Sequence, residues 1–255
     1  MPMGDLRLIH DALPEPLRAV ARMPDPRPLL GEDAKPLSGG RGGSWRVCVE
    51  SLPCLLKEER RGGMAAKILP DVFVSRGPFL EEWETARFLA RESLTPPLFV
   101  RWLLPAGPCF RCWTLGRFVE GAVSLSRVWG TGDIGVEALE DAGRFVGGLH
   151  RRGVMHGDLN LGNLLLDGAG NLQAIDWRRS VRAADLPPGP RKENLLRLVR
   201  SMHKIRRAGG ADCPPGFWPP LAEGYAEGYG EREDWAEAFV RRAEEGFPVH
   251  ALFWR

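Results

Sequence analysis

The chain has 255 residues, of which 44% are hydrophobic and 27% are charged, and these proportions exclude a wholly disordered, collagen-like or coiled-coil protein. Its net charge of +2 is too small to indicate a polyanionic partner, and we expect no nucleic acid. No run of about 18 apolar residues occurs, so no transmembrane helix is expected. The stretch MPMGDLRLIHDALPEP lacks the features of a secretory signal, which favours a cytoplasmic location.

The first half of the chain reads mainly as strands. Residues 1–37 are rich in proline and are expected to form an irregular leader. The glycine cluster and alternating apolar residues of 38–50 predict a turn between two strands, and 54–57 predict a third. An apolar stripe at helical spacing predicts a helix over 79–92. Apolar runs broken by Pro and Gly predict a hairpin within 98–120.

The second half reads mainly as helices. Gly121 is a plausible hinge, and Asp133 is expected to cap a helix that runs to Leu149. A polar loop over 153–163 precedes two short strands at 164–166 and 172–175, and the remainder is helical. This order predicts an α+β fold with two lobes, a smaller one over 38–120 and a larger one over 121–255.

The five cysteines include one C-x-x-C pair, Cys109 and Cys112. An odd number of cysteines in a chain of this size indicates reduced thiols. A structural zinc site would need a second ligand pair at the right spacing, and none occurs. We interpret the cysteines as ordinary, half-buried residues.

The most informative stretch is HGDLNLGNLLLDGAGNLQAIDW, which places Asp158, Asn163 and Asp176 around a short hairpin. A carboxylate on the loop can accept a proton from a hydroxyl. An amide oxygen and a second carboxylate can share Mg²⁺ with bound phosphates. These are the parts that in-line phosphoryl transfer requires.

This stretch resembles the catalytic loop and metal-binding aspartate of the protein-kinase-like superfamily. The resemblance implies a bilobal kinase-like fold with ATP between the lobes, Asp158 as the catalytic base, and Asn163 and Asp176 as Mg²⁺ ligands. His156 would be the structural histidine of the loop. Eukaryotic protein kinases usually carry Arg and Lys at the positions of Gly157 and Asn160, and the form found here is similar to bacterial small-molecule kinases.

The phosphate-binding residues of the smaller lobe are less distinctive. Backbone N–H groups in the glycine-rich turn can cradle phosphates. Its candidates are Gly40, Gly42, Gly43 and Ser44. Lys57, on the strand after that turn, is preferred over Lys67 as the lysine that holds the phosphates of ATP.

That lysine is expected to pair with a glutamate of the following helix. Glu82 has the right direction if Trp83 and Ala86 are buried, and Glu81 and Glu84 are alternatives. A solvated helix face is the ordinary role of any one glutamate here.

Three further segments are similar to the family of Kdo (keto-deoxy-octulosonate) kinases and lipopolysaccharide core heptose kinases. They are GRGGSW, LLKEERRGGMAAKIL and RKENLLRLVRSMHK. The resemblance implies ATP-dependent phosphorylation of a Kdo or heptose hydroxyl on a lipid A precursor, at the cytoplasmic face of the bacterial inner membrane. Trp177-Arg178-Arg179 departs from the Phe-Asp-Arg/Lys that family members often carry after the metal-binding aspartate, which leaves the exact acceptor open.

The segment 191–207 is basic on one face and apolar on the other. Such a helix suits an anionic glycolipid or a membrane surface, and a packed helix with a solvated cationic face is the alternative. The rival functions are an aminoglycoside- or choline-kinase-type enzyme, a RIO-like protein kinase, and a pseudokinase that binds a partner without chemistry.

Overall fold

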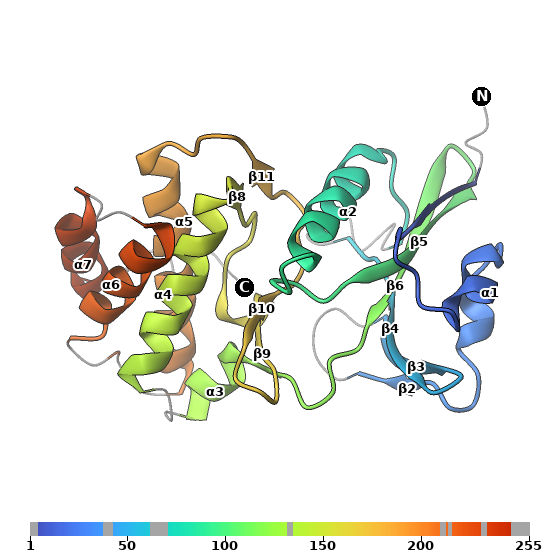
Figure 1. Cartoon of the computed structure of the whole chain (residues 1–255), viewed down its shortest axis with the longest axis horizontal. Helices are drawn as coiled ribbons and strands as arrows, with labels where there is room; N and C mark the ends of the chain where they lie inside the picture. The colour runs from blue at the N-terminus through green and yellow to red at the C-terminus, as the bar shows by residue number, and fades with distance from the viewer. Residues whose placement is uncertain are drawn as a thin grey trace. The chain divides into compact units, whose positions relative to one another are not determined.

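We describe a computed structural model of the chain over residues 5–37, 43–61, 71–131, 135–209, 213, 216–230 and 234–245. The chain divides into two compact units, Met1–Glu120 and Gly121–Arg255. Among the described residues the first unit is built on an antiparallel sheet and the second mainly on helices, which confirms the predicted α+β class (Figure 1). None of the described helices has the length and apolarity needed to cross a membrane.

The sheet of the first unit has the order β1-β5-β6-β4-β3-β2, and its strands pair antiparallel. The strands are β1 (Leu6–Ile9), β2 (Lys35–Pro36), β3 (Ser44–Val49), β4 (Leu52–Glu58), β5 (Leu98–Ala106) and β6 (Cys109–Arg117). Helix α2 (Gly77–Ala90) packs on the sheet through Phe79, which lies in one apolar cluster with Leu103 and Phe110. The fold thereby sets the inward face of α2 against β5.

The prediction of an irregular leader over 1–37 was wrong for its described part. Strand β1 pairs with β5, and the leader also contains α1 (Leu17–Arg22) and the 3-10 helix η1 (Arg27–Leu29). Leu17 and Val20 are buried in the same core as Trp102. The prolines do not disrupt these helices because Pro16 and Pro26 precede their first turns, where a fixed φ is tolerated.

The second unit carries a small hairpin among its helices. Its helices are α3 (Leu125–Thr131), α4 (Val136–Arg151), α5 (Pro188–Ala208), α6 (Trp218–Tyr229) and α7 (Ala236–Glu245). Its short elements are β7 (Val123–Ser124), β8 (Val154–Met155), the 3-10 helix η3 (Leu161–Asn163), β9 (Leu164–Leu166), β10 (Leu172–Ala174) and β11 (Val181–Arg182). The expected cap of α4, Asp133, lies outside the described residues.

Helices α4 and α6 approach so closely that their facing glycines leave no room for a side chain. A Cβ on Gly143 would lie 2.2 Å from the Leu221 carbonyl oxygen, and a Cβ on Gly224 would lie 2.0 Å from that of Glu140. Gly147 and Gly228 make the same kind of approach. This contact fixes α4, which leads directly into the loop that carries the predicted catalytic residues.

Candidate active site

The polar loop 156–163 follows α4 and β8 and runs into the antiparallel pair β9–β10. The register sets Leu164 opposite Ala174, and the Ile175 N–H donates to the Asn163 carbonyl oxygen at 2.9 Å. Asn163 and Asp176 therefore lie at the same end of the hairpin, although they are far apart in the sequence.

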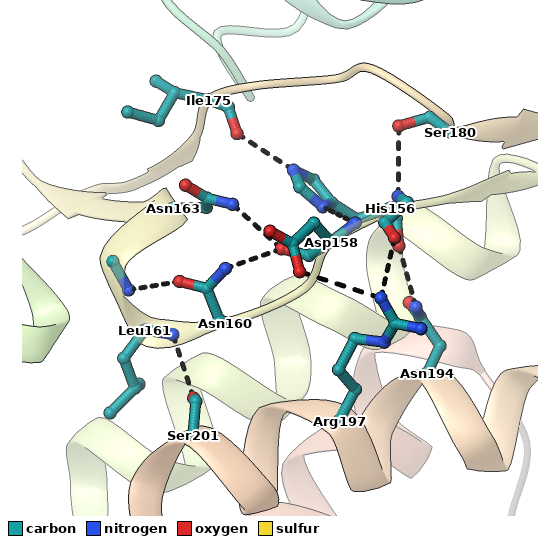
Figure 2. A network of polar contacts seen from close by, with 12 residues as sticks. His156, Asp158, Asn160, Leu161, Asn163, Ile175, Ser180, Asn194, Arg197 and Ser201 are labelled. Atoms are coloured by element: carbon teal, nitrogen blue, oxygen red, sulfur yellow. Dashed lines mark hydrogen bonds and ion pairs between the residues drawn. The ribbon is translucent and has the colours of Figure 1, made fainter. Parts of the chain in front are cut away.

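His156 links the loop to the strand before Asp176. Its Nδ1 accepts the Asp158 N–H at 3.0 Å, and its Nε2 lies 2.9 Å from the Ile175 carbonyl oxygen (Figure 2). Because Nδ1 accepts, the ring is neutral and Nε2 donates. Burial lowers the pKa of His156, which favours that neutral form. The ring also packs against Trp177, with centroids 4.7 Å apart. His156 is thus the structural centre of the loop.

The Asp158 side chain is 66% exposed, while its backbone is held in place. Its carbonyl oxygen accepts from Nδ2 of Asn160 and from Nδ2 of Asn163, each at 2.9 Å. The Asn163 amide therefore turns its Oδ1 away from Asp158 (Figure 2). The arrangement presents the Asp158 carboxylate to solvent and directs Oδ1 of Asn163 away from the Asp158 main chain.

Asp176 has a left-handed backbone with φ of 64°, a conformation that aspartate tolerates better than most residues. Its Oδ1 lies 3.6 Å from Nε of Arg178. Within the described ranges, His, Cys, Asp and Glu form no cluster of three or more that would hold a metal by themselves. An amide oxygen and a carboxylate do fit Mg²⁺, which keeps waters and phosphate oxygens as its other ligands.

Gly157 has a packing reason to be glycine. A Cβ there would lie 2.4 Å from the Arg179 carbonyl oxygen and 2.5 Å from that of Arg178. The Gly157 N–H also donates to Oγ of Ser180 at 3.3 Å. The loop is therefore pressed against the segment after Asp176, and this explains why the arginine of protein kinases has no room here.

Helix α5 contributes contacts that sequence reasoning missed. Asn194 donates from Nδ2 to the His156 carbonyl oxygen at 2.8 Å, and its Oδ1 lies 3.1 Å from Nε2 of the buried His150. Nδ1 of His150 in turn lies 2.9 Å from the Tyr225 hydroxyl. A chain of neutral hydrogen bonds thus runs from α6 through α4 and α5 to the loop.

The segment RKENLLRLVRSMHK shows a polar helix face, but its sequence does not show which residues that face contacts. Asn194, Arg197 and Ser201 are three and four residues apart, the spacing of one helix face. The predicted apolar stripe is largely buried, but this polar face is directed at the loop.

In the first unit, Lys57 lies on β4 opposite Ser44 of β3. Its Nζ is 3.2 Å from Oε2 of Glu59, a carboxylate that is only 1% exposed. Gly43 precedes β3 with φ of 78°, and its carbonyl oxygen accepts the Glu58 N–H at 2.7 Å. Gly40, Gly42 and Lys67 lie outside the described residues.

Helix α2 turns Glu82 inward, with Trp83 and Ala86 buried, and leaves Glu81 and Glu84 exposed. Oε2 of Glu82 lies 3.1 Å from Nη2 of Arg101, which is almost fully buried on β5. Arg101 also donates to Oγ1 of Thr114 at 3.0 Å and to the Phe79 carbonyl oxygen at 2.7 Å. Sequence reasoning missed both Arg101 and Glu59, and the assignment of Glu82 to Lys57 stays a prediction.

The cysteines are thiols, and two of them are buried deeply. Burial raises the pKa of the Cys54 thiol to about 11 and raises that of Cys112 further. Neither is therefore a reactive thiolate at neutral pH. The prediction of half-buried cysteines is confirmed for Cys109 and Cys213 but was wrong for the buried Cys54 and Cys112 and for the exposed Cys48.

The arrangement of His156, Asp158, Asn163 and Asp176 is compatible with a kinase-like phosphotransferase, and the comparison with known families identifies the chain as one. Residues 34–217 match the lipopolysaccharide kinase (Kdo/WaaP) family, and the chain belongs to that family.

Similar proteins include 3-deoxy-D-manno-octulosonic acid kinases of several bacteria. That of Xanthomonas campestris pv. campestris (strain B100) is 34% identical over 185 residues, which cover 69% of this chain and 72% of the relative. That of Xylella fastidiosa (strain M12) is 35% identical over 194 residues, which cover 72% and 75%.

Proposed function

We propose that this chain transfers the terminal phosphoryl group of ATP to a hydroxyl of Kdo on a lipid A precursor. The observation that carries the proposal is the geometry of the loop, in which an exposed Asp158 lies beside the amide of Asn163 and the hairpin brings Asp176 to the same end. The relatives named as 3-deoxy-D-manno-octulosonic acid kinases support Kdo over heptose as the acceptor.

Each residue has a role that its environment supports. Asp158 orients the acceptor hydroxyl and receives its proton, because its carboxylate faces solvent while its backbone is held by two asparagines. Oδ1 of Asn163 and the carboxylate of Asp176 would hold Mg²⁺, and the ion would neutralise phosphate charge. In the sheet unit, Lys57 binds phosphate oxygens, and the backbone at Gly43 and Ser44 covers the phosphates. Glu59 positions Lys57, and Glu82 positions Arg101.

The partner of the chain is an anionic glycolipid, presented at a membrane surface. Exposed cations near the end of α5, Lys204 and Arg207, suit peripheral contact with such a surface. The contact is electrostatic, so it weakens as the salt concentration rises.

The decisive experiment is mass spectrometry of Kdo-lipid A precursor after incubation with the protein and Mg-ATP, in detergent micelles and in anionic vesicles. We expect the mass of one phosphate to be added by the wild type. Asp158→Ala is expected to lose this activity by about 10²- to 10⁴-fold, the usual contribution of a general base. Its melting temperature is expected to stay unchanged, because the lost carboxylate is exposed.

The nucleotide site is tested separately by thermal unfolding. We expect Mg-ATP to raise the melting temperature of the wild type, and Asp176→Asn to reduce that shift. ATP binding without any modified lipid would contradict the Kdo assignment and would direct attention to soluble sugars, aminoglycosides and proteins as acceptors.

A further inference from the structure

Helix α5 holds the catalytic loop with three side chains from one face. Asn194 donates to the His156 carbonyl oxygen, and Arg197 donates from Nη1 to the Gly157 carbonyl oxygen at 2.9 Å. Oγ of Ser201 accepts the Leu161 N–H at 3.1 Å (Figure 2). All three bonds go to the main chain of the loop.

Arg197 differs from its two neighbours in charge and in exposure. Its side chain is 46% exposed, and the same Nη1 lies 3.7 Å from Oδ1 of Asp158. A neutral donor would be enough to hold a carbonyl oxygen, as Asn194 demonstrates. A guanidinium adds a fixed positive charge next to the carboxylate on which the acceptor hydroxyl must be placed.

The loop from His156 to Asn163 contains no lysine or arginine side chain of its own. Its sequence is HGDLNLGN. In phosphoryl transfer, negative charge spreads over the three outer oxygens of the transferred group, and catalysis consists mainly of positioning and of neutralising this charge. A cation near Asp158 can add to the neutralisation that Mg²⁺ would supply, and Arg197 reaches that place from α5.

The geometry of the Arg197 guanidinium suits the binding of phosphate oxygens. The group has five N–H donors in a rigid, planar arrangement. Nη1 contacts the Gly157 carbonyl oxygen and Oδ1 of Asp158. Nε and Nη2 are therefore the atoms that can bind two phosphate oxygens. The bond to Gly157 holds the guanidinium at a fixed distance from the loop, which reduces the entropy lost when an anion binds.

We propose that Arg197 is a catalytic residue that binds the oxygens of the phosphoryl group during transfer. This inference rests on the proposed function. The bond between the terminal phosphorus and the bridging oxygen of ATP breaks, and a bond from that phosphorus to the acceptor oxygen forms. The hydroxyl proton passes to Asp158, ADP leaves with the electron pair, and Arg197 keeps its protons throughout.

The test measures kcat, and KM for ATP and for the acceptor, in Arg197→Ala, Arg197→Lys and the control Arg144→Ala. Arg144 lies on α4 with a similar exposure of 41% and pairs with surface carboxylates. We expect Arg197→Ala to lower kcat by about 10²- to 10³-fold, as for removal of one donor to transition-state charge. Both KM values are expected to change little, Arg197→Lys to recover part of kcat, and Arg144→Ala to behave as the wild type.

Chemical rescue separates charge neutralisation from a structural role. Methylguanidinium in solution should restore part of kcat to Arg197→Ala and should not change the wild type. Asn194→Ala removes a neighbouring loop contact without removing charge, so it should not respond to methylguanidinium. A raised KM for the acceptor with unchanged kcat would overturn the proposal, and so would a loss of kcat that is equal in Arg197→Ala and Asn194→Ala and that methylguanidinium leaves unchanged in both.

If the wild type transfers no phosphate to the lipid, the proposed function fails and Arg197 is tested without an acceptor. Mg-ADP with aluminium fluoride mimics the transferred group, and it should raise the melting temperature of the wild type more than Mg-ADP alone does. Loss of this additional shift in Arg197→Ala, with the Mg-ADP shift retained, supports the role. An additional shift equal to that of the wild type overturns it.

Discussion

The two units of this protein differ in the polar side chains that they bury. The sheet unit buries Arg101 with Glu82, and it buries Glu59 next to a half-buried Lys57. The helical unit buries mainly neutral groups, His150, His156 and Asn194, with Arg191 as a buried cation over the Tyr229 ring, and it leaves the Asp158 carboxylate in solvent. A buried charge needs a partner at all times, whereas a carboxylate that must meet substrate has to remain accessible. The buried ion pair stabilises the sheet unit, whereas the exposed Asp158 stays accessible for the catalytic role that we propose for it.

The largest expected effect on stability comes from removing one member of the buried ion pair between Arg101 and Glu82. Arg101→Met would remove the guanidinium that lies 3.1 Å from the buried Glu82 carboxylate. We expect the free energy of unfolding to fall by about 3–5 kcal/mol, as is usual when such a pair is broken. Urea titration of the full chain measures this loss.

The double variant Arg101→Met/Glu82→Met should recover most of that stability, because neither member of this pair is then left buried without the other, and Glu59 keeps its contact with Lys57. The control Arg87→Met removes a half-buried arginine of α2 that pairs with the exposed Asp11, and it should cost about 1 kcal/mol or less. Equal losses for Arg101→Met and Arg87→Met would show that burial of the pair does not matter.

Acidification tests the neutral network of the helical unit. Burial, opposed by the hydrogen bond to Asn194, lowers the pKa of His150 to about 4, and Arg191 lowers it too. The folded protein thus binds fewer protons than the unfolded chain between the ordinary pKa of about 6.5 and about 4. The contribution of His150 to the free energy of unfolding is therefore fully present above that range. It falls as the pH drops through the range, by up to about 1.4 kcal/mol per pH unit.

The measurement is the free energy of unfolding between pH 7 and pH 4.5 for the wild type and for His150→Gln. The variant is less stable at pH 7, because the bonds to Asn194 and Tyr225 are disturbed. Its stability should nevertheless fall less steeply with acid. His156, whose pKa is also lowered, titrates in both proteins, so the difference in slope belongs to His150. Identical slopes would contradict a neutral, buried His150.

Adding a Cβ at Gly157 in the loop is expected to have the smallest effect on stability. Gly157→Ala places a Cβ against the main chain of Arg178 and Arg179, and such overpacking usually costs about 1–3 kcal/mol. Gly168→Ala is the matched control, because a Cβ there meets nothing within 4 Å. Differential scanning calorimetry should show a lower melting temperature for Gly157→Ala alone, and phosphate transfer should fall with it. A tolerated Gly157→Ala would mean that the loop can move away from the segment after Asp176.

Local patterns were enough to locate the loop and its hairpin. The segment from His156 to Trp177 is short, and the function that we propose for it depends on the spacing of residues along one stretch of chain. The strand of Lys57 and the inward direction of Glu82 also follow from alternation and helical spacing, and the structure places both as expected. Family membership followed from the same kind of local evidence, three short segments.

Only the tertiary structure decided which groups support that site. Asn194 bonds to a residue 38 positions away and Arg197 to one 40 positions away, and no periodicity specifies such a contact. In the same way, the leader joins the sheet through β1 and β5, and the glycines of α4 and α6 meet across a long separation in sequence. The physical reason is that a local pattern records which face of an element is buried, whereas the partner on that face is chosen by packing of the whole unit.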